Sequence, residues 1–239
     1  MKEMNSACSD EMFLSGCDCA EPIWEETMPF VMDVAEIRKR LFLQVISAKR
    51  VPLGIPAVHW EDLAIVARIM IHSGDNEMQS AMVTEAVMEA MGMCTEELYA
   101  VALENATVIA PFSITNLKEL MVAFSEELPE TEEEMIQTWD AEGEDALYVV
   151  TCRQGIYGAA SMFYPDFVTR AEAMCGGGFY VLPASIHEVM IVSDKVQIRC
   201  EDLKEMVSEI NSSTLEEWER LSDSVYHYDP ACKVLKRCC

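Results

Sequence analysis

The sequence predicts an α+β fold, in which helices pack on a mixed or antiparallel sheet and the chain forms two strand-strand-helix halves. Three observations lead to this class. Short runs of β-branched and aromatic residues alternate with longer segments whose apolar residues recur at helical spacing. Glycines and prolines separate these runs, as is typical of turns. The chain has 239 residues, 51% of them hydrophobic and 25% charged, so it can bury a core of its own.

Four consecutive segments are expected along the chain. Residues 1–33 mix cysteines and acidic residues with scattered apolar ones and show no sustained period, which predicts a loosely ordered extension. Residues 34–128 form the first α+β half, and residues 129–146 form an acidic connection. Residues 147–239 form the second half, which ends in a hairpin.

The first half begins with predicted strands. Leu41–Ser47 is rich in β-favouring residues and predicts a strand. Leu63–Ile71 is almost continuously apolar, which fits either a strand buried on both faces or a short buried helix. The turn-forming residues His72–Asn76 follow it, and they favour a hairpin with Met78–Val83.

Three helices are expected next, with ends indicated by capping residues. Thr84 is placed to cap the first helix, which ends at Gly92. Thr95 begins the second helix, which runs to about Asn105. Residues 115–127 carry apolar side chains at spacings of three and four and predict the third.

The second half alternates strands with helices. Its expected strands are Leu147–Cys152, Gly158–Tyr164, Phe179–Leu182 and Val189–Val192, followed by a hairpin of Val225–Tyr228 with Val234–Lys236. Its expected helices are 165–175 and 202–210, with a helical turn at Glu216–Leu221. Because Leu63–Gly92 and Leu147–Gly176 both follow the order strand, turn, strand, helix, an internal repeat is one interpretation. Chance recurrence of a common unit is the other.

The acidic charge is large and unevenly distributed. The chain has 17 Lys+Arg against 42 Asp+Glu, a net charge of −25, which disfavours direct binding to nucleic acids and anionic membranes. The segment from Ile69 to Cys152 carries −17, with Lys118 as its one basic residue, and the rest of the chain carries −8. Ten acidic side chains that fall close together are the candidate partner-binding residues: Glu126, Glu127, Glu130, Glu132, Glu133, Glu134, Asp140, Glu142, Glu144 and Asp145.

Three interpretations of this acidic run stay open. It could be a solvated face that keeps the protein soluble. It could be a docking surface for a basic partner, including a nucleic-acid-binding protein whose groove the carboxylates occupy by mimicking phosphates. Calcium binding is the third, although the segment from Asp140 to Asp145 lacks the frame that ends in a bidentate Glu.

A catalytic alternative depends on the few histidines. His59, Glu61 and Asp62 lie close in sequence and could form an acid/base pair, which with His187 defines a hydrolytic or metal-assisted enzyme. Structural caps or hydrogen bonds are the competing roles for these residues. The segment after His187 begins like a zinc-protease motif, but Ile191 stands where the second histidine is required. No phosphate loop or dinucleotide fingerprint occurs, and we expect no cofactor.

The ten cysteines are expected to be mostly thiols, because the chain is long and shows no signal-peptide pattern. Four within apolar sequence are expected to be small buried hydrophobes: Cys94, Cys152, Cys175 and Cys200. Four near the ends could form a zinc or redox element if the termini met: Cys17, Cys19, Cys238 and Cys239. Their spacing fits no standard zinc motif, so frayed, oxidation-prone ends are the alternative.

Five motifs occur together along most of the chain: WEDLAIV from Trp60, TEELYAVALEN from Thr95, FYVLPASIHEV from Phe179, LKEMVSEIN from Leu203 and LSDSVYHYD from Leu221. In this combination the chain resembles an uncharacterised bacterial family known only as a domain of unknown function. The resemblance covers roughly residues 40 to 229. It implies a bacterial or phage-borne intracellular protein, and it implies no activity and no catalytic residues.

The sequence therefore favours a non-enzymatic cytoplasmic interaction protein. Its acidic face is expected to bind a basic protein partner and to inhibit or regulate a nucleic-acid-binding protein by phosphate mimicry. The hydrolytic or metal-assisted enzyme is the alternative.

Overall fold

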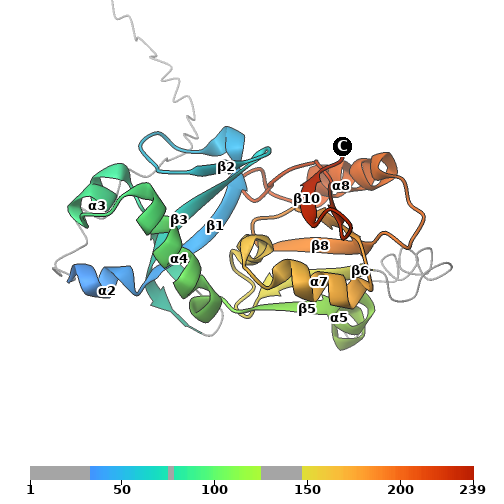
Figure 1. Cartoon of the computed structure of the whole chain (residues 1–239), viewed down its shortest axis with the longest axis horizontal. Helices are drawn as coiled ribbons and strands as arrows, with labels where there is room; N and C mark the ends of the chain where they lie inside the picture. Colours follow the sequence, from blue (N-terminus) through green and yellow to red (C-terminus); the bar gives the residue numbers. More distant parts are fainter. Residues whose placement is uncertain (1–32, 75–77, 125–146) are drawn as a thin grey trace, which may run out of the picture. The chain divides into compact units, whose positions relative to one another are not determined.

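The computed structural model describes residues 33–74, 78–124 and 147–239 (Figure 1). These residues form two antiparallel sheets with helices packed on them, so the predicted α+β class is confirmed. Val34–Cys239 forms one compact unit. The predicted extension, apart from Asp33, and the predicted acidic connection lie outside the described residues, and the domain boundaries stay predictions.

The first sheet is built around one long strand. Its strands are β1 (Leu41–Ser47), β2 (Val58–Trp60), β3 (Leu63–Ser73) and β4 (Met78–Met82). β1 pairs with one side of β3, and β2 and β4 pair with the other side. The apolar run Leu63–Ile71, which fitted either a strand or a helix, is therefore a strand. Its predicted hairpin with β4 is confirmed.

The helices beside this sheet follow the capping signals. They are α2 (Val34–Arg38), the 3-10 turn η1 (Ala48–Arg50), α3 (Glu85–Ala90) and α4 (Thr95–Ile109). Thr84 Oγ1 accepts a hydrogen bond from the Val87 N–H at 3.2 Å, which confirms the predicted cap. Gly92 takes a φ of +66° after α3, a conformation that favours glycine. Figure 1 shows α4 lying across the sheet, and Ala102 and Ala106 allow its close approach to β1.

The second sheet has the strand order β10-β9-β7-β8-β6-β5. Its strands are β5 (Phe112–Asn116), β6 (Leu147–Cys152), β7 (Phe179–Leu182), β8 (Glu188–Ser193), β9 (Tyr226–Asp229) and β10 (Val234–Arg237). The predicted C-terminal hairpin is confirmed as β9 and β10, with β10 at the edge. The start predicted for the third helix is wrong, since residues up to Asn116 pair with β6 and the helix α5 (Leu117–Phe124) begins after them.

One predicted strand is wrong. Residues 158–163 form a 3-10 helix, η2 (Gly158–Phe163), which packs against β1 of the first sheet and against β6 and β8 of the second. A Cβ at Gly158 would lie 2.4 Å from the Cys152 backbone N and 2.5 Å from the His187 carbonyl O, so only glycine fits. This close approach places η2 in the core between the two sheets, and the second half of the supposed repeat lacks its second strand.

Two helices cover opposite faces of the second sheet. α7 (Phe167–Cys175) packs against β7 and β8, on the side that faces the main core. α8 (Cys200–Thr214) buries Leu203 and Val207 against Leu182, Val192 and Val225 in a separate apolar cluster. The segment predicted as a helical turn at Glu216–Leu221 contains a hydrogen-bonded turn but no helix. None of the described helices is long and apolar enough to cross a membrane.

Candidate functional site

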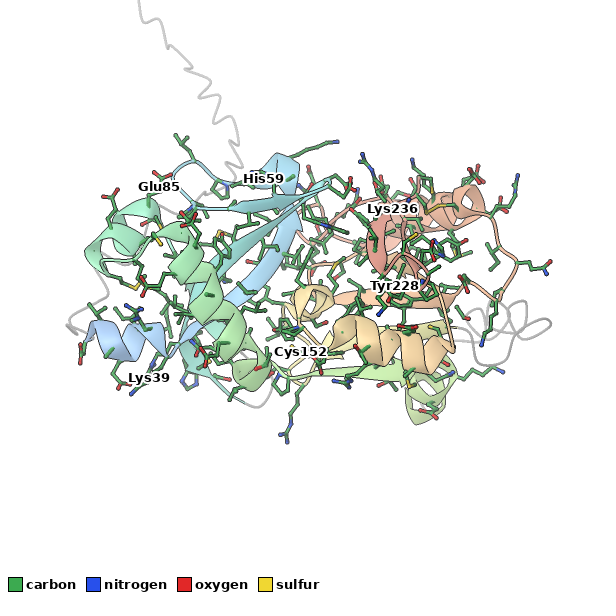
Figure 2. All side chains as sticks on the ribbon, viewed as in Figure 1. Lys39, His59, Glu85, Cys152, Tyr228 and Lys236 are labelled. Carbon is green, nitrogen blue, oxygen red and sulfur yellow. A yellow bond between two sulfur atoms is a disulfide. The ribbon has the colours of Figure 1, made fainter. Side chains whose placement is uncertain are left out.

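The ten acidic residues predicted to bind a partner, from Glu126 to Asp145, lie outside the described residues. The wider acidic segment from Ile69 to Cys152 also contains α3 and α4, which the structure does describe. Four exposed carboxylates on these helices form what we call the α3–α4 acidic surface: Glu85, Glu89, Glu96 and Glu104. Figure 2 labels Glu85 at the start of α3.

This surface has few positive charges in the sequence around it. No Lys or Arg occurs between Ile69 and Asn116. Among the described residues, Glu97 of α4 has an ion-pair partner, since Arg38 of α2 contacts it. A hydrogen bond from its own backbone N–H lowers the pKa of Glu96 at the start of α4. Glu85, Glu89, Glu96 and Glu104 all face solvent.

Asp62, a predicted catalytic residue, lies between β2 and β3, and three hydroxyls hold its carboxylate. Ser222 Oγ and Ser224 Oγ donate to Oδ2 at 2.5 and 2.9 Å, and the Tyr226 hydroxyl donates to Oδ1. Partial burial acts to raise the pKa of Asp62, but the hydrogen bonds from Ser222, Tyr226 and Ser224 outweigh it and the pKa lies below its usual value. We call these four residues the Asp62 junction, which joins the two sheets.

His59 and Glu61, the other predicted catalytic residues of this segment, make no hydrogen bond to the Asp62 carboxylate among the described residues. His59 is exposed on β2, as Figure 2 shows. Glu61 has a φ of +53° in the tight turn before β3, and its carboxylate lies 3.7 Å from the Arg237 guanidinium on β10. Trp60, between them, stacks on Tyr226 with ring centroids 4.7 Å apart. The segment thus contacts the second sheet through Trp60, Glu61 and Asp62.

His187, before β8, has a defined set of partners. Its Nδ1 accepts a hydrogen bond from the Tyr157 backbone N–H at 3.4 Å, and its Nε2 lies 3.6 Å from the Glu219 carboxylate. Its ring stacks on Tyr157 and meets the edge of Trp218. Because Nδ1 accepts, the neutral ring carries its proton on Nε2, facing Glu219.

The structure does not join His187 to Asp62 by any contact among the described residues. The partners of His187 and the partners of Asp62 have no residue in common, although Glu219 and Ser222 lie on the same segment. The signal for the Asp62 partners was present in the sequence. Ser222, Ser224 and Tyr226 alternate at a spacing of two, which places three hydroxyls on one side of an extended segment.

Two of the four cysteines expected to be buried are buried. Cys152 donates to the Ile156 carbonyl at 2.9 Å, and burial raises the pKa of Cys175 to about 11. The expectation is wrong for Cys94, which is exposed, and for Cys200, which forms a disulfide with Cys238. Cys200 departs from the expectation because it opens α8 beside the C-terminal strand, where its sulfur meets a second one.

The structure brings together a different set of cysteines from the one predicted at the chain ends. Cys17 and Cys19 lie outside the described residues, so their part in it stays a prediction. Cys200, Cys238 and Cys239 bring their sulfur atoms within 4.8 Å of one another. We call these three residues the α8 cysteine cluster. No sequence signal pointed to Cys200, because it lies 38 residues from Cys238.

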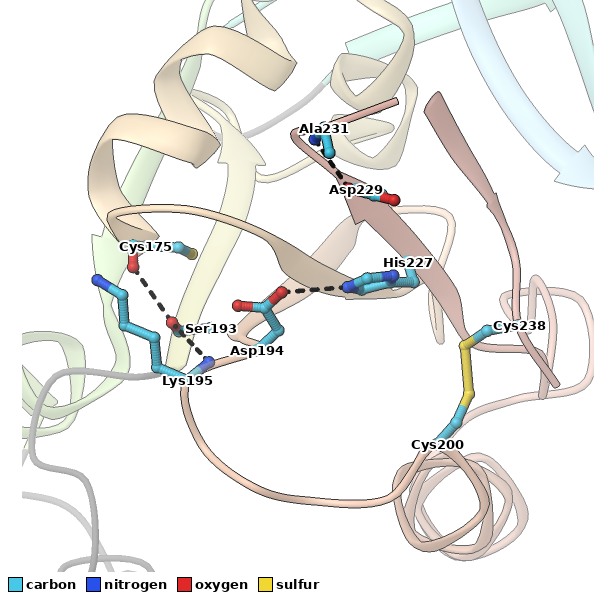
Figure 3. A network of polar contacts seen from close by, with 9 residues as sticks. All are labelled: Cys175, Ser193, Asp194, Lys195, Cys200, His227, Asp229, Ala231 and Cys238. Carbon is cyan, nitrogen blue, oxygen red and sulfur yellow. Dashed lines mark hydrogen bonds and ion pairs between the residues drawn. A yellow bond between two sulfur atoms is a disulfide. The ribbon is translucent and has the colours of Figure 1, made fainter. Parts of the chain in front are cut away.

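A polar pair lies on the same side of the second sheet as the α8 cysteine cluster (Figure 3), and the sequence did not predict it. His227 Nε2 on β9 is 3.3 Å from the Asp194 carboxylate, just after β8, as Figure 3 shows. Tyr180 on β7 packs against the His227 ring with centroids 4.8 Å apart. Burial raises the pKa of Tyr180, with further contributions from the charges of Asp194 and Cys239. Tyr180 also packs against the same apolar cluster as Cys200 and Cys239.

A half-buried cation lies between the first sheet and η2. Arg68 on β3 donates to Gln44 Oε1 at 2.8 Å and to the Ser80 side chain and carbonyl at 2.9 and 2.8 Å. Its guanidinium lies 4.9 Å from the centroid of the Tyr157 ring, and burial lowers its pKa. No carboxylate pairs with Arg68 in the part of the chain that the structure describes.

The described residues thus define an α+β protein with two antiparallel sheets joined through η2 and the Asp62 junction. The chain belongs to the family of unknown function DUF5688, whose model matches residues 15–230. This match confirms the resemblance to an uncharacterised domain family. No curated protein and no solved structure matches the chain.

Proposed function

We propose that this protein is a non-enzymatic interaction protein whose acidic face binds a basic partner and regulates it. The observation that carries the proposal is the charge distribution, with −17 between Ile69 and Cys152 and a single basic residue there. The exposed carboxylates of the α3–α4 acidic surface extend the predicted acidic run along the chain. Such a field attracts cationic surfaces and sets the register of docking.

The class of partner follows from the charge. A basic protein that binds DNA or RNA presents cations spaced for phosphates, and carboxylates on a rigid helix can occupy that groove. The proposal therefore names inhibition or regulation of a nucleic-acid-binding protein. It rests on a cytoplasmic location, where nucleic-acid-binding proteins are abundant and single thiols such as exposed Cys94 stay reduced.

The roles of the predicted catalytic residues agree with a binding function. Asp62 has both carboxylate oxygens engaged by hydroxyls and a lowered pKa, which disfavours a proton-transfer role near neutral pH. His59 is exposed and has no carboxylate partner among the described residues.

The test is capture of partners from a bacterial lysate on the full-length protein, with elution across a salt series. The Debye length falls from about 10 Å at 0.1 M to about 3 Å at 1 M, so a partner held by charge should elute as salt rises. A double-stranded oligonucleotide should displace the same partner at low salt.

Two neutralised variants locate the surface. One carries Glu85→Gln, Glu89→Gln, Glu96→Gln and Glu104→Gln, and the other carries Glu132→Gln, Glu133→Gln, Glu134→Gln, Glu142→Gln and Glu144→Gln. The matched control is Glu205→Gln with Glu209→Gln, two exposed carboxylates on α8. Loss of the salt-eluted partner in either acidic variant, with retention in the control, supports the proposal. Equal retention in all three contradicts it.

A further inference from the structure

Three sulfur atoms from two separate segments meet at the start of α8. Cys200 is the first residue of α8, and Cys238 and Cys239 directly follow β10. All three sulfurs lie within 4.8 Å of one another, and Cys200 and Cys238 are joined as a disulfide, which Figure 3 shows. A structural disulfide needs two cysteines, so the third sulfur has no role in it.

The backbone holds the two C-terminal cysteines in place independently of their sulfurs. The Cys238 N–H donates to the Val225 carbonyl at 2.9 Å, and the Val225 N–H donates to the Cys239 carbonyl at 3.3 Å. These bonds extend the ladder of β9 and β10 by one more step. The cluster is therefore fixed from one side by a sheet and from the other by a helix, which is how a ligand site is preorganised.

The surroundings differ on the two sides of the cluster. Cys200 and Cys239 pack against the apolar cluster of α8, and the Cys239 thiol donates to the Cys200 carbonyl at 3.1 Å. Cys238 is exposed to solvent. A cation bound by the three sulfurs would thus be enclosed by protein on one side and would keep a position open to solvent on the other.

We propose that the α8 cysteine cluster is a redox-controlled site for a thiophilic divalent cation of the Zn²⁺ type. In the reduced protein three thiolates bind the cation, and a solvent molecule completes the tetrahedron. Zn–S bonds of about 2.3 Å place tetrahedral sulfurs about 3.8 Å apart, within reach of the observed cluster once the disulfide is open. Oxidation closes the disulfide and releases the cation.

The oxidation step balances with a low-molecular-weight disulfide as the oxidant. The thiolates of Cys200 and Cys238 lose two electrons and form one S–S bond. The oxidant, such as glutathione disulfide, gains these two electrons as its S–S bond breaks and leaves as two thiolates, which take protons from water. Cys239 keeps its sulfur reduced, and the cation, left with one protein ligand, dissociates.

The first experiment uses the full-length protein, reduced with a phosphine and stripped of metal, and titrates it with Co²⁺ without oxygen. Thiolate-to-cobalt charge-transfer absorption should saturate at one equivalent, and Zn²⁺ should abolish it. Removing a residue that only hydrogen-bonds to a metal ligand weakens metal binding by about 10- to 100-fold. Cys200→Ser or Cys238→Ser removes a ligand itself, so either substitution should weaken Co²⁺ binding by at least about 100-fold. No absorption in the wild type, or unchanged absorption in Cys200→Ser, overturns the proposal.

Matched controls separate this cluster from the other cysteines. Cys94→Ser and Cys232→Ser replace exposed cysteines and should leave Co²⁺ binding unchanged. Cys17→Ser with Cys19→Ser should also leave it unchanged, and loss of binding there would assign the site to the termini instead. Circular dichroism of each variant checks that the fold is retained.

The second experiment tests the redox control. Glutathione disulfide added to the zinc-loaded protein should release Zn²⁺ to a chromophoric chelator at the rate at which the disulfide forms. Peptide mapping should then find Cys200 joined to Cys238. Zinc that stays bound after this disulfide has formed, or a different pairing, contradicts the switch.

Discussion

The C-terminal part of the chain, from the start of α8 to the residues after β10, is held at two places. These places differ in whether every polar or sulfur group has a bonded partner. At the Asp62 junction a carboxylate meets three hydroxyls, and both of its oxygens are engaged. At the α8 cysteine cluster a disulfide uses two sulfurs and leaves Cys239 beside it with a free thiol. The first anchor joins the two sheets, and the second joins α8 to β10.

The difference separates a structural contact from a site that can change state. A buried polar group with all its partners stabilises one arrangement, since any change leaves a partner unsatisfied. A cluster with one more sulfur than the disulfide needs can exchange bonds or bind a soft cation. We therefore expect the Asp62 junction to set stability and the cysteine cluster to respond to redox conditions.

The largest effect is expected from opening the disulfide. Its cysteines are 38 residues apart, and a loop of this length stabilises the folded state by about 3 to 4 kcal/mol in the chain-entropy model. Reduction with a phosphine should lower the free energy of unfolding in urea by this amount, measured by fluorescence of the tryptophans. Cys238→Ser should match the reduced wild type, and Cys239→Ser should match the oxidised one. A loss below about 1 kcal/mol would show that the disulfide constrains little.

The second effect is expected at the Asp62 junction. Asp62→Ala leaves the hydroxyls of Ser222, Ser224 and Tyr226 without their acceptor, and bonds to a charged group contribute about 1.5 to 3 kcal/mol. We expect a loss of about 2 to 3 kcal/mol in the same urea experiment. Ser224→Ala, which removes one of the three donors, should cost about 1 kcal/mol. Equal effects of the two substitutions would show that the hydroxyls do not act through Asp62.

Most helices and strands could be predicted from local sequence patterns. Leu41–Ser47 and the Thr84 cap could be predicted because their signals lie within a few residues of sequence. The segment at Gly158 could not, because its conformation follows from its close approach to the Cys152 backbone N at the end of β6 and to the His187 carbonyl just before β8. The start of α5 moved for the same reason, since pairing with β6 extended β5 to Asn116.

The candidate sites were less predictable than the fold, because each one combines distant residues. Asp62 was picked out by the sequence, but its partners lie about 160 residues further along the chain. Cys238 was picked out as well, whereas Cys200 looked like a small core residue from its apolar neighbours. Composition identified the chemistry that was available, and only the fold shows which groups meet.

A third prediction uses pH to sharpen the contrast between the anchors. The pKa of Asp62 is lowered in the folded state, so its stabilisation is present above the unfolded pKa of about 3.9 and is lost as pH falls through the folded value. The free energy of unfolding of the wild type should therefore exceed that of Asp62→Asn by about 1 to 2 kcal/mol near neutral pH. This difference should shrink in acid. Thermal unfolding from about pH 7 to pH 3 measures it. A difference that stays constant over this range would exclude Asp62 as the titrating group.

The smallest effect is expected at Asp194, a carboxylate with one side-chain hydrogen-bond partner among the described residues, where Asp62 has three. Its contact with His227, which is an ion pair when the ring is protonated, spans 3.3 Å with both side chains about 30% exposed, and such pairs contribute about 0.2 to 1 kcal/mol. Asp194→Asn keeps the shape of the side chain that packs beside Gly178, so only the charge changes. The loss in stability should be below about 1 kcal/mol and should fade at 1 M salt, because exposed charges are screened. The Asp62→Asn effect, measured beside it, should persist in salt, since three direct hydrogen bonds hold that carboxylate. The same salt dependence at both positions would mean that the number of partners does not distinguish them.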